Sequence, residues 1–108
     1  MLDISTGKVV RVIALTREYG PDNPHLRDYI ASLNEDEQIS LVALMWIGRE
    51  TFDASELDEA VETARAEATA PTEDYLLGIP MLADYLEDGL NALGISLEEA
   101  EEDIYPSV

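Results

Sequence analysis

A run of apolar residues in the middle of the chain constrains the fold more than any other feature. From Glu35 to Ile47 a helix would place large apolar side chains on every side, since successive residues turn by about 100°. These side chains are Ile39, Leu41, Val42, Leu44, Met45, Trp46 and Ile47. A helix that is apolar all round has to be surrounded by other elements. We therefore predict a central, covered helix over Glu35–Ile47, with Gly48 as its left-handed end.

Helix start and stop signals surround this segment. The segment Ser5–Tyr19 suits a strand by its β-branched residues, but no later segment offers it a strand partner, and we predict a helix. The start signals further on are Asn23 before Pro24, the capping-box pairs Asn34/Glu37 and Asp53/Glu56, Thr72, Pro80, and Ser96 with Glu99. Gly94 is a stop signal, and Gly89, inside a helix, indicates that two helices approach closely.

These signals predict one all-α domain over residues 1–108, with five or six short helices packed around the central one. We expect residues 1–4 and 105–108 to be loose ends. The N-terminus has no apolar stretch of signal-peptide length, and the longest uncharged run, residues 38–48, is too short to span a bilayer. Together with the absence of cysteine, these features predict a cytoplasmic protein.

Charge excludes several classes of partner. The chain has 24 acidic and 6 basic residues, a net charge of −18, and residues 50–108 carry 17 of the acids but only one base, Arg65. Such a chain repels phosphate groups, so direct binding to nucleic acid or to an anionic membrane is disfavoured. We expect the partner to be another protein, of basic character, or a second copy of the chain.

The segment "ALMWIGRE" at 43–50 holds the only tryptophan and ends in a base. Trp46 shares a helical face with Ile39 and Val42, so a core position is favoured over the floor of a ligand site. Arg49 is placed to bond the last carbonyls of the helix or to pair with Asp53. Any apolar surface left over for a partner is expected around Trp46, Arg49, Tyr75 and Tyr85.

Paired carboxylates suggest the one enzymatic alternative, a magnesium-dependent phosphohydrolase similar to the helical nucleotide pyrophosphohydrolases. The candidate metal ligands are Glu59, Glu62, Asp84 and Glu87. The apolar stripes of their helices turn these side chains outward, whereas a metal site needs ligands that converge between helices. No glycine-rich phosphate loop, calcium-binding loop or nucleophile motif is present, and we expect no bound cofactor.

The order and spacing of three stretches carry a resemblance to a known family. These stretches are "ALMWIGR", the acidic helix after "FD", and "YLLG-P-LADYLE-GL". The chain resembles a small bacterial family catalogued as domain of unknown function 3775, well over Leu33–Gly94 and loosely over the first helix. The resemblance implies a cytoplasmic proteobacterial protein and supports a helical first segment. The family has no established activity, so no functional residue carries over.

We therefore expect an acidic helical protein that acts as a protein-interaction or regulatory module, and an enzymatic role is less favoured. Besides the phosphohydrolase, a second alternative is an acidic mimic of nucleic acid that blocks a basic groove. The one-sided charge of residues 50–108 supports that alternative. The last segment, "SLEEAEEDIY", is expected to dock on the domain through Leu97, Ala100 and Ile104, or to detach and bind a basic groove.

Overall fold

The computed structural model describes residues 2–68 and 71–95 of the chain. Within them it contains helices and no strands, which confirms the all-α prediction. The elements are α1 (Thr6–Tyr19), α2 (Pro24–Ser32), α3 (Glu35–Gly48), the 3₁₀-helix η1 (Ala54–Glu56), α4 (Leu57–Glu67), α5 (Thr72–Leu77) and α6 (Leu82–Ala92). No helix in the described ranges is long and apolar enough to cross a membrane. The helix expected to start at Ser96 lies outside them.

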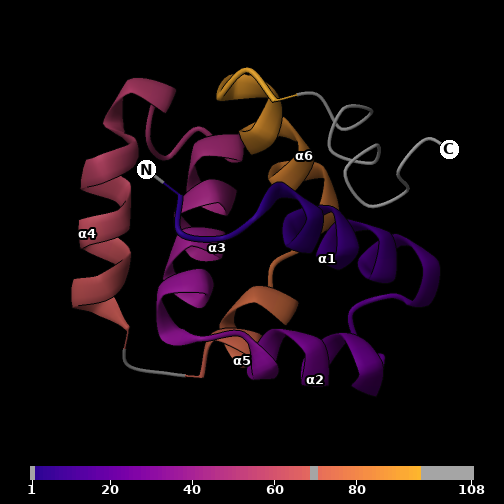
Figure 1. Cartoon of the computed structure of the whole chain (residues 1–108). Coiled ribbons are helices and arrows are strands. Elements are labelled where there is room, and N and C mark those ends of the chain that lie inside the picture. Colours follow the sequence, from indigo (N-terminus) through magenta and orange to yellow (C-terminus); the bar gives the residue numbers. More distant parts are fainter. Residues whose placement is uncertain (1, 69–70, 96–108) are drawn as a thin grey trace, which may run out of the picture.

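Helix α3 is the centre of the fold, as its apolar pattern predicts. Every residue from Ile39 to Ile47 is buried, including the hydroxyl-bearing Ser40. Figure 1 shows α4 on one side of α3 and α6 on the other, with α1 beside α6 and with α2 and α5 across one end. The most extensive packing is between α3 and α6, followed by that between α3 and α4. The core is therefore organised around one helix, whose residues from Ile39 to Ile47 are covered by the other elements.

The helix starts predicted at Asn23, Asn34 and Asp53 are present. The Asn23 side chain accepts hydrogen bonds from the backbone N–H groups of His25 and Leu26. Both capping boxes form, at Asn34/Glu37 before α3 and at Asp53/Glu56 around η1, from which α4 continues. These caps satisfy backbone donors that the first helical turn leaves without partners.

Residues 2–4, expected as a loose end, lie against the core. Ile4 is buried, and Leu2 packs against the core with part of its surface exposed. The backbone N–H of Asp3 donates to Ser40 Oγ at 2.8 Å, which gives the buried hydroxyl of α3 its partner. Burial of Ile4 and this hydrogen bond hold the segment in place.

The prediction that Gly48 is the left-handed end of the central helix is wrong. Gly48 is the last residue of α3, and a Cβ atom there would lie 1.7 Å from Tyr85 O on α6. The left-handed position falls on Glu50, with φ of 68°. The N–H of Thr51 bonds the carbonyl of Trp46 at 2.9 Å, which completes a Schellman motif around Glu50. The glycine is needed for the helix crossing, so a glutamate takes the strained position.

Helix α6 confirms two predictions and corrects one. Gly89 does mark a close approach, because a Cβ atom there would lie 2.4 Å from Leu44 O. Gly94 has φ of 82°, and the N–H of Ile95 bonds the carbonyl of Leu90 at 2.8 Å, so this end is also a Schellman motif. The helix does not open at Pro80, since Met81 adopts a left-handed φ of 62° and α6 begins at Leu82.

Candidate functional site

The basic residues of the chain are used to join its helices. Among the residues that the structure describes, four of the six form ion pairs between elements. Lys8 of α1 pairs with Glu37 of α3, and Arg27 of α2 pairs with Asp74 of α5. Arg17 of α1 reaches Asp84 at 3.0 Å and Glu87 at 3.2 Å on α6, and Arg65 of α4 reaches Asp36 of α3 at 3.0 Å.

The two other bases are also engaged with their own chain. The guanidinium of Arg11 lies over the ring of Tyr29, 5.2 Å from its centre. Arg49 Nε donates to Thr51 Oγ1 at 3.2 Å, just past the end of α3. Within the described ranges Arg49 has no ion pair with Asp53 or with α4. Arg49 is exposed, and the hydrogen bond of its side chain goes to a neutral side chain of its own loop.

The Lys8–Glu37 pair is the most sheltered of these contacts, since the Glu37 side chain is nearly buried. The hydrogen bond from Lys8, and a second from the backbone N–H of Asn34, lower the pKa of the Glu37 carboxyl. The same contact raises the pKa of Lys8. Glu37 thus closes the capping box of α3 and ties that helix to α1.

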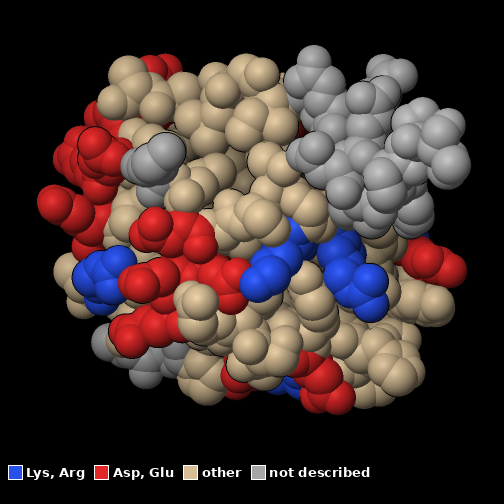
Figure 2. All heavy atoms as spheres, viewed as in Figure 1, with Lys and Arg blue, Asp and Glu red and all other residues tan. Residues whose placement is uncertain are grey.

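Acidic side chains outnumber basic ones by 24 to 6, and the exposed acids gather on one part of the surface. Figure 2 shows them gathered over α4 and the neighbouring part of α3. We define the acidic face of α4 as three of its exposed carboxylates, Glu59, Glu62 and Glu67. The one base of α4, Arg65, is bonded to Asp36. This face therefore presents negative charge to any approaching molecule.

The four candidate metal ligands do not form a site in the described ranges. Glu59 and Glu62 are exposed on α4, whereas Asp84 and Glu87 of α6 are bonded to Arg17 of α1. Helices α4 and α6 lie on different sides of α3 in Figure 1. Nowhere in residues 2–68 and 71–95 do three or more acidic or histidine side chains gather closely enough to hold a metal ion.

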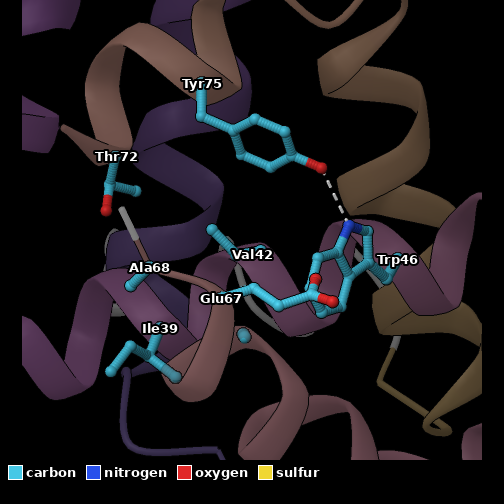
Figure 3. Close-up of a pocket in the computed structure, with 8 residues that line it drawn as sticks. Ile39, Val42, Trp46, Glu67, Ala68, Thr72 and Tyr75 are labelled. Atoms are coloured by element: carbon cyan, nitrogen blue, oxygen red, sulfur yellow. Dashed lines mark hydrogen bonds between the residues drawn. The ribbon is translucent and has the colours of Figure 1, made fainter. Parts of the chain in front are cut away.

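A cavity of about 230 Å³ opens between α3, α4 and α5. Its lining residues are Ile39, Val42 and Trp46 of α3, Ala64 and Glu67 of α4, Ala68, and Thr72 and Tyr75 of α5. We call this cavity the α3–α4–α5 groove. Figure 3 shows Trp46 and Tyr75 facing each other at one end of it, where the indole Nε1 donates to the Tyr75 hydroxyl at 3.0 Å.

The groove exists because α4 packs on α3 through alanines. Ala60 and Ala64 are the buried residues of α4, and opposite them α3 presents much larger side chains. An alanine brings the helix axes together but adds little volume beside them, so space remains next to Ile39 and Val42. The sequence shows alanines at 60, 64 and 68 on the inner stripe of this helix. That run of small residues was the available signal of a groove.

The predicted partner surface is thus divided. Trp46 and Tyr75 come together at the groove; Trp46 is 7% exposed and Tyr75 38%. Arg49 lies past the end of α3, and Tyr85 is half-buried on α6 with its backbone against Gly48. The lining residues Ala64, Glu67, Ala68 and Thr72 were absent from the sequence-based candidates. They come from the end of α4 and the start of α5, which the sequence alone does not place beside Trp46.

Comparison with known proteins places the chain in a family and goes no further. No curated protein and no solved structure matches it. The model of one family, described as "Protein of unknown function (DUF3775)", matches residues 23–95, which is more than half of the chain and includes α2 to α6. This result confirms the resemblance seen in "ALMWIGR" and "YLLG-P-LADYLE-GL". The chain therefore belongs to the DUF3775 family of proteins of unknown function.

Proposed function

We propose that this protein is an interaction module that binds a basic protein partner through the acidic face of α4. The observation that carries the proposal is that the basic side chains are engaged within the molecule, whereas the acidic ones are far more numerous. Each of the six bases contacts a side chain of the same molecule, and within residues 2–68 and 71–95 the ion pairs with these bases involve five acids, whereas the whole chain has 24. The positive charges are engaged in contacts within the molecule, and the protein keeps a net charge of −18, with many acidic side chains exposed to solvent.

The same surplus narrows the class of partner. Nucleic acids and anionic membranes carry the same sign of charge as the protein and are repelled by it. A second copy of the chain brings another net −18 and has its bases already engaged, so a basic partner is favoured over a homodimer. Long-range attraction between opposite charges speeds such an association, and salt weakens it.

Neither alternative is favoured by an observation in the described ranges. A phosphohydrolase needs carboxylates that converge on a metal ion, and Asp84 and Glu87 are bonded to Arg17 instead. An acidic mimic of nucleic acid differs from the proposed module in its target, a nucleic-acid-binding groove. The two are distinguished by whether added DNA or RNA displaces the captured partner.

The proposal is tested by affinity capture from a lysate of the native host with charge-reversed baits. The test bait carries Glu59→Lys with Glu62→Lys on the acidic face of α4. Its control carries Glu18→Lys with Asp22→Lys, which replace two exposed acids at the end of α1 and in the loop that follows it. Both baits therefore change the net charge by the same amount. Proteins retained by the wild type at low and high salt are identified and quantified by mass spectrometry.

We expect a basic protein that the wild type and the control bait retain at low salt and that the α4 bait loses by tenfold or more. Its retention should fall as salt rises, because exposed charges are screened over about 10 Å at 0.1 M salt. If both charge-reversed baits lost the basic protein equally, net charge alone would explain its retention, and the role of α4 would be overturned. Retention of no basic protein by the wild type would overturn the proposed function itself.

A further inference from the structure

The α3–α4–α5 groove combines an apolar floor with an acidic rim. Ile39, Val42 and Trp46 supply the floor, and each of them is largely buried. Glu67, at the end of α4, lines the same cavity and is exposed. In Figure 3 its side chain points from the end of α4 toward Trp46. A ligand that fills the groove thus has an apolar surface below it and a carboxylate beside it.

The size of the groove selects the kind of ligand. Sites for small molecules and cofactors usually measure about 300–1,000 Å³, and this cavity is about 230 Å³. An apolar cavity of about 150 Å³ is enough to hold benzene. One leucine, methionine or phenylalanine side chain therefore fits, and a whole nucleotide or cofactor does not. Anchoring of one large side chain in a pocket is a common feature of protein–protein interfaces.

The charge around the groove favours basic residues beside the anchoring side chain of the partner. Glu67 at the rim lies on the same helix as the exposed Glu59 and Glu62, and the only base of that helix is bonded to Asp36. A bound segment that carries Lys or Arg near its anchor gains opposite charges at the rim, whereas an acidic segment is repelled.

We propose that the α3–α4–α5 groove takes one large apolar side chain, from leucine to phenylalanine in size, of a partner segment with Lys or Arg on either side of that residue, and that Glu67 pairs with one of these bases. This inference rests on the proposed function and names where and how the basic partner is held. Trp46 forms part of the floor of the groove, and Tyr75 lies at its edge. The Tyr75 hydroxyl keeps the indole N–H satisfied while the groove is empty.

The test uses synthetic twelve-residue peptides rich in lysine and alanine that differ only at their central residue, which is Phe, Leu or Ala. A fourth peptide has Phe at the centre and glutamates in place of the lysines. Binding is followed by the fluorescence of Trp46, the only tryptophan, and by the shift of its indole N–H resonance in ¹H–¹⁵N NMR spectra. The proteins compared are the wild type, Ala64→Leu, its control Ala66→Leu, and Glu67→Gln.

Ala64→Leu fills the groove from α4, and Ala66→Leu is its matched control, since it adds the same side chain to the exposed side of that helix. We expect the Phe and Leu peptides to bind the wild type roughly tenfold or more tighter than the Ala peptide, as burial of one large apolar side chain requires. Ala64→Leu should remove that preference and Ala66→Leu should keep it. Glu67→Gln should weaken binding of the lysine peptides severalfold, and the glutamate peptide should not bind.

Equal affinity for the Phe, Leu and Ala peptides would overturn the inference, and the proposed function would stand if charge reversal of α4 still abolished capture. Binding of the Phe peptide with no shift of the Trp46 indole resonance would also overturn it, because the anchor would lie elsewhere. If no lysine peptide binds, the groove has no such ligand, and the capture experiment decides the proposed function separately. The peptide series on the wild type remains decisive even if Ala64→Leu fails to fold.

Discussion

The crossing of α3 and α6 makes a strong prediction about two glycines. At Gly48 a Cβ atom would lie 1.7 Å from Tyr85 O, 2.6 Å from Tyr85 C and 2.8 Å from the backbone N of Gly89. All three atoms belong to the backbone, so no side chain can rotate away. Carbon atoms need a separation of about 3.5–4.0 Å, and Gly48→Ala therefore has to part the two helices by about 2 Å at this point.

The cost follows from what the crossing holds together. Overpacking alone costs about 1–3 kcal/mol, and parting the helices also loosens Leu44, Leu86 and Leu90, which are fully buried. The gain in helix propensity from glycine to alanine offsets only about 1 kcal/mol. We expect Gly48→Ala to lower the free energy of unfolding by about 3–5 kcal/mol, out of about 5–15 kcal/mol for a typical domain.

Urea unfolding followed by circular dichroism at 222 nm measures this loss, and Gly78→Ala is the control. Gly78 has φ of −85°, and the nearest atoms to a Cβ there lie 3.5 Å away, so alanine should be neutral or stabilising by up to about 1 kcal/mol. The double variant Gly48→Ala with Gly89→Ala should cost less than the sum of its parts, because the first change already opens the crossing. If Gly48→Ala were as stable as Gly78→Ala, the reasoning would be refuted.

Three further predictions concern single residues. Glu50→Gly should raise the free energy of unfolding by about 1 kcal/mol in urea titrations, because glycine adopts φ of 68° without the strain of a side chain, whereas Glu50→Ala should bring no such gain. Glu37→Gln should destabilise the fold at pH 7 by removing the charged partner of Lys8. The pKa of Glu37 is lower in the folded state than its unfolded value of about 4.5. The difference in free energy of unfolding between this variant and the wild type is therefore fully present above pH 4.5 and should vanish as the pH falls through the folded-state pKa. Urea titrations at several pH values check this. Tyr75→Phe should cost about 0.5–1.5 kcal/mol and alter the fluorescence of Trp46, since its indole N–H loses the tyrosine hydroxyl; unchanged stability and emission would contradict the assigned hydrogen bond.

Local rules in the sequence predicted much of the fold. The caps at Asn23, Asn34 and Asp53 depend on side chains within three residues of each other, so they can be recognised without a structure. The buried run Ile39–Ile47 also follows from its pattern, since a helix that is apolar all round has no stable exposed orientation. Such features involve one element at a time.

What the sequence did not predict depends on contacts between elements. A glycine after an apolar run ordinarily ends a helix, and only the position of α6 shows that Gly48 is needed at a crossing instead. The ion pairs of Arg17 and Arg27 join residues 67, 70 and 47 positions apart, which no spacing rule indicates. The candidate surface was incomplete for the same reason, because it included Trp46 and Tyr75 but none of the α4 residues beside them.

Small residues have opposite consequences on the two sides of α3. Toward α6, glycines bring two backbones into contact, and the interface is closed. Toward α4, the small alanine side chains leave the α3–α4–α5 groove unfilled. A larger side chain at position 64 would bury more apolar surface there and stabilise the domain. Ala64→Leu should therefore raise the free energy of unfolding by about 0.5–2 kcal/mol, as cavity-filling changes commonly do, while it removes the preference for the Phe and Leu peptides over the Ala peptide. Ala60→Leu, at a fully buried position outside the groove, should instead destabilise the domain by overpacking. If Ala64→Leu also proved destabilising in urea titrations, a leucine attached at this position would not fit the groove, and the cavity-filling prediction would be wrong.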